Sequence, residues 1–101
     1  MTAVTWDDEA QCELNCSALF YAKRSDAGLA ERFIAVVEAA VANARAAPSL
    51  HRTFRDAARR VRVERFPYFV VYSYDAVSES IHILAIAHTS REPDYWRSRL
   101  A

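Results

Sequence analysis

Arginine side chains are concentrated in one short segment of this 101-residue chain, residues 52–65. The segment holds six arginines and two acidic residues, a local charge of +4 in a chain whose formal net charge is zero. Such a basic patch can bind a phosphate backbone or an acidic protein, and the alternative is a set of solvated surface charges. The six are Arg52, Arg55, Arg59, Arg60, Arg62 and Arg65, and more polar candidates follow near the C-terminus, namely His88, Arg91 and Tyr95.

Charge is divided unevenly between the two halves of the chain. Residues 1–50 carry seven acidic and four basic side chains, a net charge of −3, and residues 51–101 carry the compensating +3. Hydrophobic residues make up 52% and charged residues 26%, which is typical of one soluble globular domain spanning residues 1–101. No apolar run approaches 18 residues and the acidic start is unlike a signal region, so we expect a cytoplasmic protein without a membrane segment.

The basic segment must be held by a sheet. Residues 58–65 alternate, so we expect Val61 and Val63 to face a helical layer and Arg60, Arg62 and Glu64 to lie on an open face. The apolar runs 68–74 and 81–88, separated by the polar residues 75–80, predict a hairpin of two well-covered strands. A strict period of two in the last strand places four side chains on one face, His82, Leu84, Ile86 and His88.

Two helices are predicted before the sheet. Asp7 or Asp8 suits an N-cap, and a buried stripe follows at helical spacing, with Gln11, Glu13, Asn15 and Ser17 pointing mostly elsewhere. A turn at residues 25–28 holds the only glycine, and a second apolar-faced helix spans about residues 27–46. Tyr21 and Phe33 are expected in the core. The buried stripe of the first helix is Ala10, Leu14, Ala18 and Tyr21.

The remaining segments complete the predicted fold. Residues 3–5 can form a short first strand, and residues 49–58 read as a surface loop that enters a strand near Phe54. The polar C-terminal tail should form one helical turn that seats Trp96 in an apolar site. The sequence therefore predicts an α+β fold, with an N-terminal helical hairpin packed on a small twisted antiparallel sheet.

Two cysteines lie four positions apart on the first predicted helix. Cys12 and Cys16 therefore share a helix face, but two thiols make neither a disulfide framework nor a complete metal site. We expect ordinary semi-buried thiols, no bound metal and no cofactor.

The joint order of these motifs resembles the RelE/ParE superfamily of toxins from bacterial type II toxin–antitoxin operons, often called plasmid stabilisation proteins. The resemblance covers essentially the whole chain. Two features depart from the family pattern: residues 49–58 and 75–80 contain no glycine, and the basic strand contains no lysine. The residues that carry the resemblance are Glu9-Ala10, Leu14, Ala18, Tyr21, Arg32-Phe33, Arg65-Phe66-Pro67-Tyr68, Val71-Tyr72, Ile83 to His88, Arg91 and Tyr95-Trp96-Arg97.

The RelE branch of this resemblance implies a ribosome-dependent mRNA endonuclease that needs no metal. Attack by a ribose 2′-hydroxyl requires a proton acceptor, cations for the phosphorane and a proton donor for the leaving oxygen. The implied catalytic residues are Arg62, His88 as base or acid, Arg91 as phosphate clamp and Tyr95 as stacking or orienting group. The implied phosphate-binding residues are Arg59, Arg60 and Arg65.

The ParE branch implies a different class of function, a non-enzymatic inhibitor that binds DNA gyrase. A third alternative is an inactive family member that acts only as a binding module. Either active branch implies a neutralising antitoxin that adds a strand to a sheet edge or lays an amphipathic helix into an apolar groove. We expect an exposed apolar surface for it near Leu19 and Phe20 or at a free strand edge, and a homodimer through that surface when no antitoxin is present.

Overall fold

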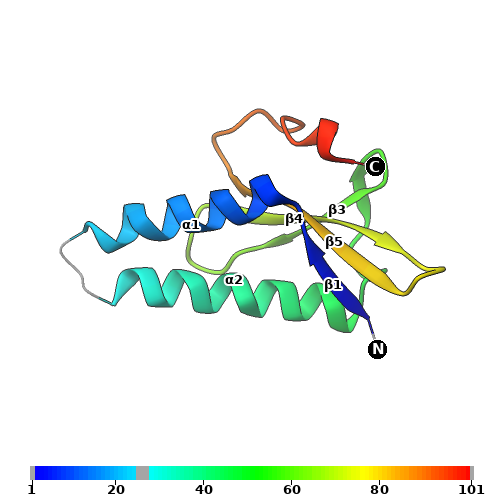
Figure 1. The fold of residues 1–101 in the computed structure, drawn as a ribbon, viewed down its shortest axis with the longest axis horizontal. Helices are drawn as coiled ribbons and strands as arrows, with labels where there is room; N and C mark the ends of the chain where they lie inside the picture. The colour runs from blue at the N-terminus through cyan, green and yellow to red at the C-terminus, as the bar shows by residue number, and fades with distance from the viewer. Residues whose placement is uncertain (1, 25–27, 101) are drawn as a thin grey trace.

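A five-stranded sheet with two helices on one face forms the protein in the computed structural model, which describes residues 2–24 and 28–100 (Figure 1). This architecture confirms the predicted α+β fold. The strands lie in the order β1-β5-β4-β3-β2. Their bounds are β1 Ala3–Trp6, β2 Thr53–Arg55, β3 Ala58–Arg62, β4 Tyr68–Asp75 and β5 Ser80–His88.

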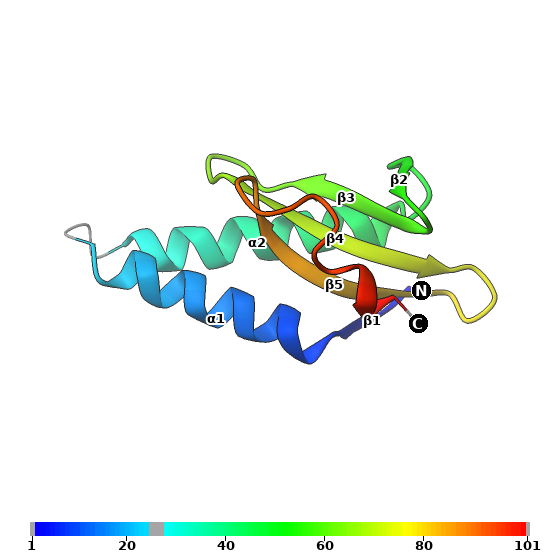
Figure 2. The ribbon, with the colours of Figure 1, turned by 90° about the horizontal axis from the view of Figure 1, so that it is seen from above.

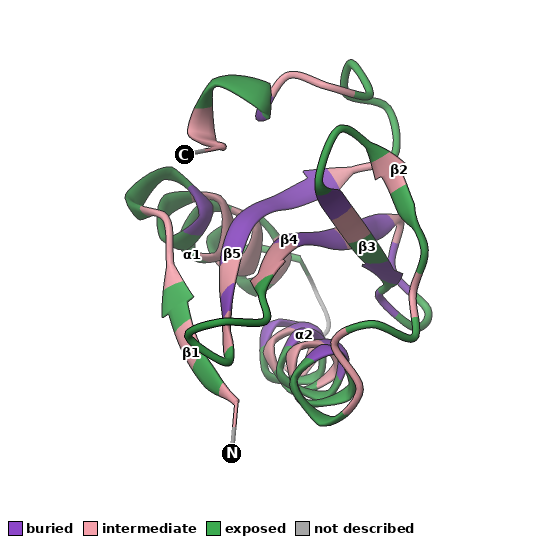
Figure 3. Cartoon of the chain, turned by 90° about the vertical axis from the view of Figure 1, so that its right-hand side faces the viewer, coloured by how far each residue is buried: buried purple, intermediate pink, exposed green. Residues whose placement is uncertain are grey.

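One pair of strands is parallel, so the expectation of a wholly antiparallel sheet was wrong for that pair. β1 runs parallel to the first half of β5, with Ala3 opposite Ser80 and Trp6 opposite Ile83. Parallel neighbours need a long connection, and here both helices and three strands intervene along the chain. β4 and β5 occupy the centre of the sheet, where most of their residues are buried (Figure 3). This burial explains why neither central strand shows a clean apolar/polar alternation.

The two helices form the predicted antiparallel hairpin. α1 (Asp8–Ala22) begins after Asp7, whose carboxylate accepts the Glu9 backbone N–H at 2.9 Å. This N-cap satisfies one of the free N–H groups at the helix start. α2 (Leu29–Ala46) is longer and faces the sheet with one apolar side. Of the predicted turn at residues 25–28, positions 25–27 lie outside the described residues.

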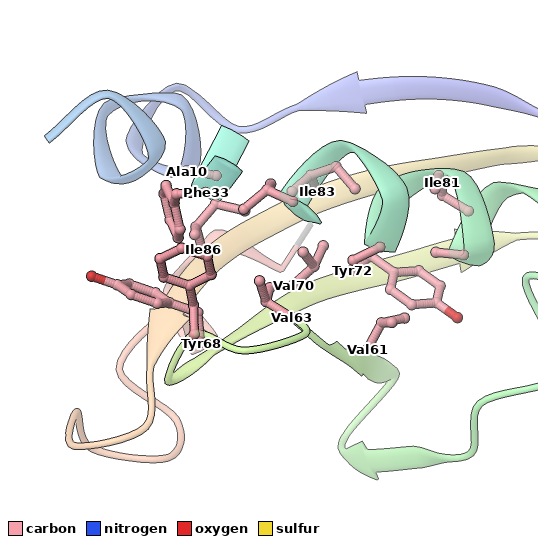
Figure 4. Close-up of a cluster of buried hydrophobic side chains, with 14 residues drawn as sticks. Ala10, Phe33, Val61, Val63, Tyr68, Val70, Tyr72, Ile81, Ile83 and Ile86 are labelled. Carbon is pink, nitrogen blue, oxygen red and sulfur yellow. The ribbon is translucent and has the colours of Figure 1, made fainter. Parts of the chain in front are cut away.

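The main core lies between the helices and the sheet (Figure 4). Its aromatic centre joins both helices to the sheet, because the rings of Tyr21, Phe33, Phe66 and Tyr68 lie at edge-on or tilted angles with centroids 5.0–6.4 Å apart. Aromatic pairs of this geometry each contribute about 0.5–1.5 kcal/mol beyond burial. Val61 and Val63 are buried in this cluster, as their alternation predicted.

A β-bulge changes the face assignments on β5. Val71 pairs with Ala85, whereas Tyr72 pairs with Ile83, so one extra residue lies on β5 at this point. Leu84 and Ala85 consequently belong to one core cluster, and Ile86 returns to the helical side. The strict alternation predicted for His82, Leu84, Ile86 and His88 was therefore wrong after Leu84.

The second face of the sheet is covered by the C-terminal segment, so the predicted open face is not bare. The chain turns back after β5 and lies along the sheet on the side away from the helices (Figure 2). A 3-10 turn, η1 (Arg97–Arg99), follows Trp96, as predicted for the C-terminal tail. Trp96 itself is fully buried, which confirms the predicted apolar site for its side chain. Alanines at positions 58, 85 and 87 leave room for the indole against the strands.

Three turns place non-glycine residues in the left-handed backbone region. Asp56, Arg65 and Glu79 have φ values of 51°, 68° and 52°. They lie in the connections β2–β3, β3–β4 and β4–β5. The turns that lack glycine are therefore built with strained residues, each at a cost of roughly 1–2 kcal/mol.

Replacing Glu79 with glycine should raise the free energy of unfolding by about 0.5–1 kcal/mol, because glycine avoids the Cβ clash but loses more chain entropy on folding. Urea denaturation measures the change. Ala76→Gly in the same turn is the matched control, since Ala76 has no positive φ. A Glu79→Gly protein no more stable than the control would contradict this account of the turn.

No helix within residues 2–24 and 28–100 is long and apolar enough to cross a membrane.

Candidate functional site

Two of the predicted site arginines are bound to the protein's own backbone. On the helical side, Arg59 donates to the carbonyl of His51 at 2.5 Å and so fixes the loop after α2. Arg62 donates to the carbonyls of Val63, Phe66 and Tyr68 and closes the loop between β3 and β4. Both guanidinium groups therefore have structural partners.

Arg62 is expected to contribute to stability. Arg62→Ala should lower the free energy of unfolding by about 1.5–3 kcal/mol, because hydrogen bonds from a charged donor to three carbonyls are lost. Arg65→Ala is the control. The Arg65 side chain is 85% exposed, and its one ion pair is long, with 3.8 Å between Nε and Oε1 of Glu64. Its loss should therefore cost at most about 0.5 kcal/mol. Equal effects in urea denaturation would show that the carbonyl contacts of Arg62 contribute nothing.

Arg60 lies on the face opposite the helices and stacks on two aromatic rings. Its guanidinium carbon is 4.5 Å from the centroid of Phe54 and 4.3 Å from that of Phe69. A cavity of about 90 Å³ opens beside it, with His88 and Arg91 also among its lining residues. The structure thus gathers three of the seven predicted site residues around one cavity. Its volume is far below the roughly 300 Å³ at which small-molecule pockets begin.

His88 ends β5 on the helical side of the sheet. It pairs with Tyr68, and the two rings meet edge to face at 5.0 Å. Its Nδ1 accepts the Ser90 backbone N–H at 3.0 Å and lies 2.7 Å from the Ser90 hydroxyl. This geometry leaves the proton on Nε2 in the neutral ring. Arg62 contacts Phe69 on the other face, so His88 and Arg62 do not act on a common point.

Tyr95 and Arg91 meet on the C-terminal segment. The Arg91 guanidinium lies 3.8 Å from the Tyr95 ring centroid, a cation–π contact at the surface. The Tyr95 hydroxyl donates to Oε2 of Glu13 at 2.8 Å. Burial and this hydrogen bond to a carboxylate raise the pKa of Tyr95 well above its ordinary value. The phenol is therefore a neutral donor that is already engaged.

Glu13 is the polar residue that the sequence analysis missed. Its carboxylate accepts two hydrogen bonds from the Arg99 guanidinium, at 3.0 and 3.1 Å, and one from the backbone N–H of Ile86 at 3.1 Å. Arg99 also donates to the carbonyl of Leu84 at 2.9 Å. β1 pairs with β5 only as far as Ile83, so Glu13 and Arg99 satisfy the strand edge that β1 leaves open.

One signal for this role was present in the sequence. Glu13 lies three positions after Ala10 and directly before Leu14, at the border of the buried stripe of α1. A carboxylate at such a border can point toward the core when a partly buried cation forms an ion pair with it. Its partner, 86 positions away in sequence, could not be identified from spacing alone.

Tyr95 makes stability depend on alkaline pH. An unfolded tyrosine loses its proton near pH 10, whereas the raised pKa of folded Tyr95 holds the proton to higher pH. The contribution of Tyr95 to the free energy of unfolding should therefore be fully present below about pH 10 and be lost as the pH rises above that value. Tyr95→Phe should show a shallower fall than the wild type in urea denaturation between pH 9 and 11. Tyr74→Phe serves as control, and identical slopes for all three proteins would contradict the prediction.

An apolar groove lies away from these residues, between β1 and α2. Its volume is about 790 Å³, and Val4, Trp6 and Val41 supply much of its wall. β1 is an edge strand, so its outer backbone groups are available to an added strand. The predicted apolar surface near Leu19 and Phe20 is also confirmed, because these side chains are 60% and 50% exposed. The molecule therefore offers two separate apolar surfaces to partners.

The part of the chain that the structure describes contains no cluster of metal-binding side chains. Among those residues no group of three or more His, Cys, Asp or Glu side chains is placed to hold an ion. Cys12 and Cys16 are both exposed thiols, so the expectation of semi-buried thiols was wrong. The reason is that α1 turns its Ala10 and Leu14 side to the sheet and leaves both cysteines on its outer side.

The comparisons with known proteins agree with this architecture. The sequence family described as "ParE toxin of type II toxin-antitoxin system, parDE" matches residues 4–93. The solved chromosomal ParDE TA system from P. aeruginosa has a chain with a TM-score of 0.75 and 16% identity, covering 89% of this chain and 98% of that one. The isolated E. coli RelE toxin gives a TM-score of 0.61 at 11% identity, with 98% and 96% covered. No curated protein sequence matches.

Proposed function

Because this chain belongs to the ParE toxin family of type II toxin–antitoxin systems, we propose that it arrests growth by binding DNA gyrase and not by cutting RNA. The observation that carries the proposal is that the polar groups expected to perform cleavage are already bound within the protein. Arg62 is held by three carbonyls, Tyr95 by Glu13, and Nδ1 of His88 by Ser90. A binding module needs no such groups to be free, only a stable surface.

The coverage of the second sheet face supports this proposal. The C-terminal segment covers much of the face opposite the helices, and the cavity beside Arg60, His88 and Arg91 is small. A cavity of about 360 Å³ lies at the other end of that face, but its lining, which includes Ser73, His82 and Leu100, contains none of the predicted site residues. A nucleotide held for in-line attack would need room for a base, a ribose and a phosphate at one place. The proposed gyrase-binding surface therefore lies outside the sheet face.

Ribosome-dependent mRNA cleavage is the second candidate, and one observation favours it. Arg60, His88 and Arg91 line the same cavity, and Arg60 and Arg91 are exposed. Two cations beside a histidine could stabilise a phosphorane and move a proton. In this alternative Arg60 and Arg91 bind phosphate, and His88 acts through Nε2 once its ring turns from Tyr68 on the helical side toward the cavity.

Two assays separate these candidates. Purified protein should inhibit supercoiling by gyrase while mRNA in a cell-free translation mixture stays intact. The double variant Arg60→Ala plus His88→Ala, with folding checked by circular dichroism, should keep this inhibition. If the wild-type protein cleaves the mRNA and the double variant leaves it intact, the result would contradict gyrase binding and support nuclease activity. Activity in neither assay would support the third alternative, an inactive member that acts only as a binding module.

The family implies an antitoxin partner, and we place it at the groove between β1 and α2. An extended segment can add to the free edge of β1 and insert alternate apolar side chains beside Trp6 and Val41. The Arg45 guanidinium, which donates to the Thr2 carbonyl at 2.7 Å, stands in the groove wall and suits an acidic residue of that segment. Gyrase and ribosomes are cytoplasmic targets, so the proposal places the toxin in the cytoplasm.

A further inference from the structure

The outer side of α1 carries a second apolar stripe. Cys12 and Cys16 are exposed, and so are Leu19 and Phe20, although the inner side of the same helix is already apolar. Positions 12, 16 and 19 follow the i, i+4, i+7 spacing of a helix-packing face. Figure 2 shows α1 at the rim of the molecule with no described element beyond it. This stripe lies on a different helix from the groove beside β1 and is not explained by it.

The residues on this side are complementary to themselves when the helix is reversed. Positions at equal distance from the point midway between Asn15 and Cys16, half a residue from the centre of α1, pair as Asp8 with the C-cap Lys23, Cys12 with Leu19 and Asn15 with Cys16. All six are exposed. Two antiparallel copies of α1 would therefore place acid beside base at both ends and thiol beside leucine between them. A parallel pair would set like charges against each other.

We propose that the free protein forms a two-fold homodimer through antiparallel α1 helices centred between Asn15 and Cys16. Such an interface is isologous, because each contact occurs twice. One helix pair falls in the small interface class, below about 1,200 Å² in total, so the dimer dissociates on dilution. The charge pairing selects a second copy of this chain over an unrelated helix. This inference is independent of the toxin's target.

The cysteines provide a geometric test. Packed helices lie about 8–10 Å apart and have a Cα radius of about 2.3 Å, so facing Cα atoms approach to about 3.5–5.5 Å, a range that overlaps the usual Cα separation of a disulfide. In such a pair the two Cys16 residues are offset along the helix axis by about one residue, or about 1.5 Å. The two Cys12 residues lie about seven residues, or about 10 Å, apart, which no disulfide spans.

Oxidation of the two single-cysteine proteins tests the proposal. Cys12→Ser, which keeps Cys16, should form a covalent dimer at least about tenfold faster than Cys16→Ser, which keeps Cys12. Leu19→Asp should abolish the dimer in analytical ultracentrifugation, whereas Val77→Asp, at a 96% exposed turn position, should not. Asp8→Lys and Lys23→Asp should each weaken association, and the double variant should restore it.

Several results would overturn the proposal. Equal cross-linking of the two single-cysteine proteins would indicate random collision. A protein that stays monomeric at all concentrations would exclude the dimer. In that case a requirement for Leu19 in antitoxin binding would assign the exposed stripe of α1 to the antitoxin. Failure of the charge-swapped double variant to recover would exclude the antiparallel arrangement. None of these results bears on whether gyrase or mRNA is the target.

Discussion

Trp96→Ala is expected to lower the free energy of unfolding by about 3–5 kcal/mol, the usual cost of removing a buried indole. The Trp96 side chain is 1% exposed, and its ring lies 5.6 Å from that of Phe54. It packs on the face of the sheet that the helices do not reach, against Val71, Leu84 and small alanines. Without the indole, the C-terminal segment loses its main apolar contact and that face becomes accessible to water.

Urea denaturation followed by circular dichroism measures this loss. A domain of this size has a total stability of about 5–15 kcal/mol, so the variant should unfold at much lower urea concentration. Val77→Ala is the control, because Val77 is 96% exposed and its truncation should cost at most about 0.5 kcal/mol. A Trp96→Ala protein as stable as this control would mean that the C-terminal segment does not hold the sheet.

Glu13→Ala is the second change with a large expected effect, a loss of about 3–5 kcal/mol. The side chains of Glu13 and Arg99 are only 17% and 11% exposed and form a bidentate pair. Removing the carboxylate leaves a largely desolvated guanidinium without that partner and frees the backbone N–H of Ile86. The cost exceeds that of a surface ion pair because both charges are withdrawn from water.

Glu9→Ala is the matched control. Glu9 also pairs with Arg99, at 2.8 Å, but its side chain is 70% exposed. Its loss should therefore cost less than about 1 kcal/mol. The double variant Glu13→Leu plus Arg99→Met should recover only part of the stability, since it removes both buried charges but leaves the Ile86 N–H and the Leu84 carbonyl without these partners. Equal effects of Glu9→Ala and Glu13→Ala would contradict the assignment of Glu13 as the carboxylate that closes the β5 edge.

These two contacts limit access to the face of the sheet opposite the helices. Trp96 fills the surface, and Glu13 with Arg99 fixes the segment that carries Tyr95. A substrate would have to displace this segment to reach the strands beneath Trp96. Exposed apolar surface is present elsewhere, on the outer side of α1 and in the groove beside β1. Exposed apolar surfaces of this kind are typical of sites that other proteins cover.

The sequence by itself determined the secondary structure and most of the helical core. The 3.6-residue spacing in residues 10–21 and 29–44 and the alternation at 58–63 placed Phe33, Val61 and Val63 correctly. These patterns are local, because a helix or strand repeats its exposure within a few residues. The joint order of the elements was also sufficient to predict the family.

The tertiary structure alone decided which polar side chains meet. A single extra residue at Leu84–Ala85 moved His88 to the helical side, and no local pattern marks a bulge within the continuous apolar run of residues 83–87. The pairing of Glu13 with Arg99 joins two ends of the chain, and the parallel placement of β1 leaves the strand edge that this pair closes. Such contacts depend on how distant elements pack, so the positions of the site residues became known only from the folded chain.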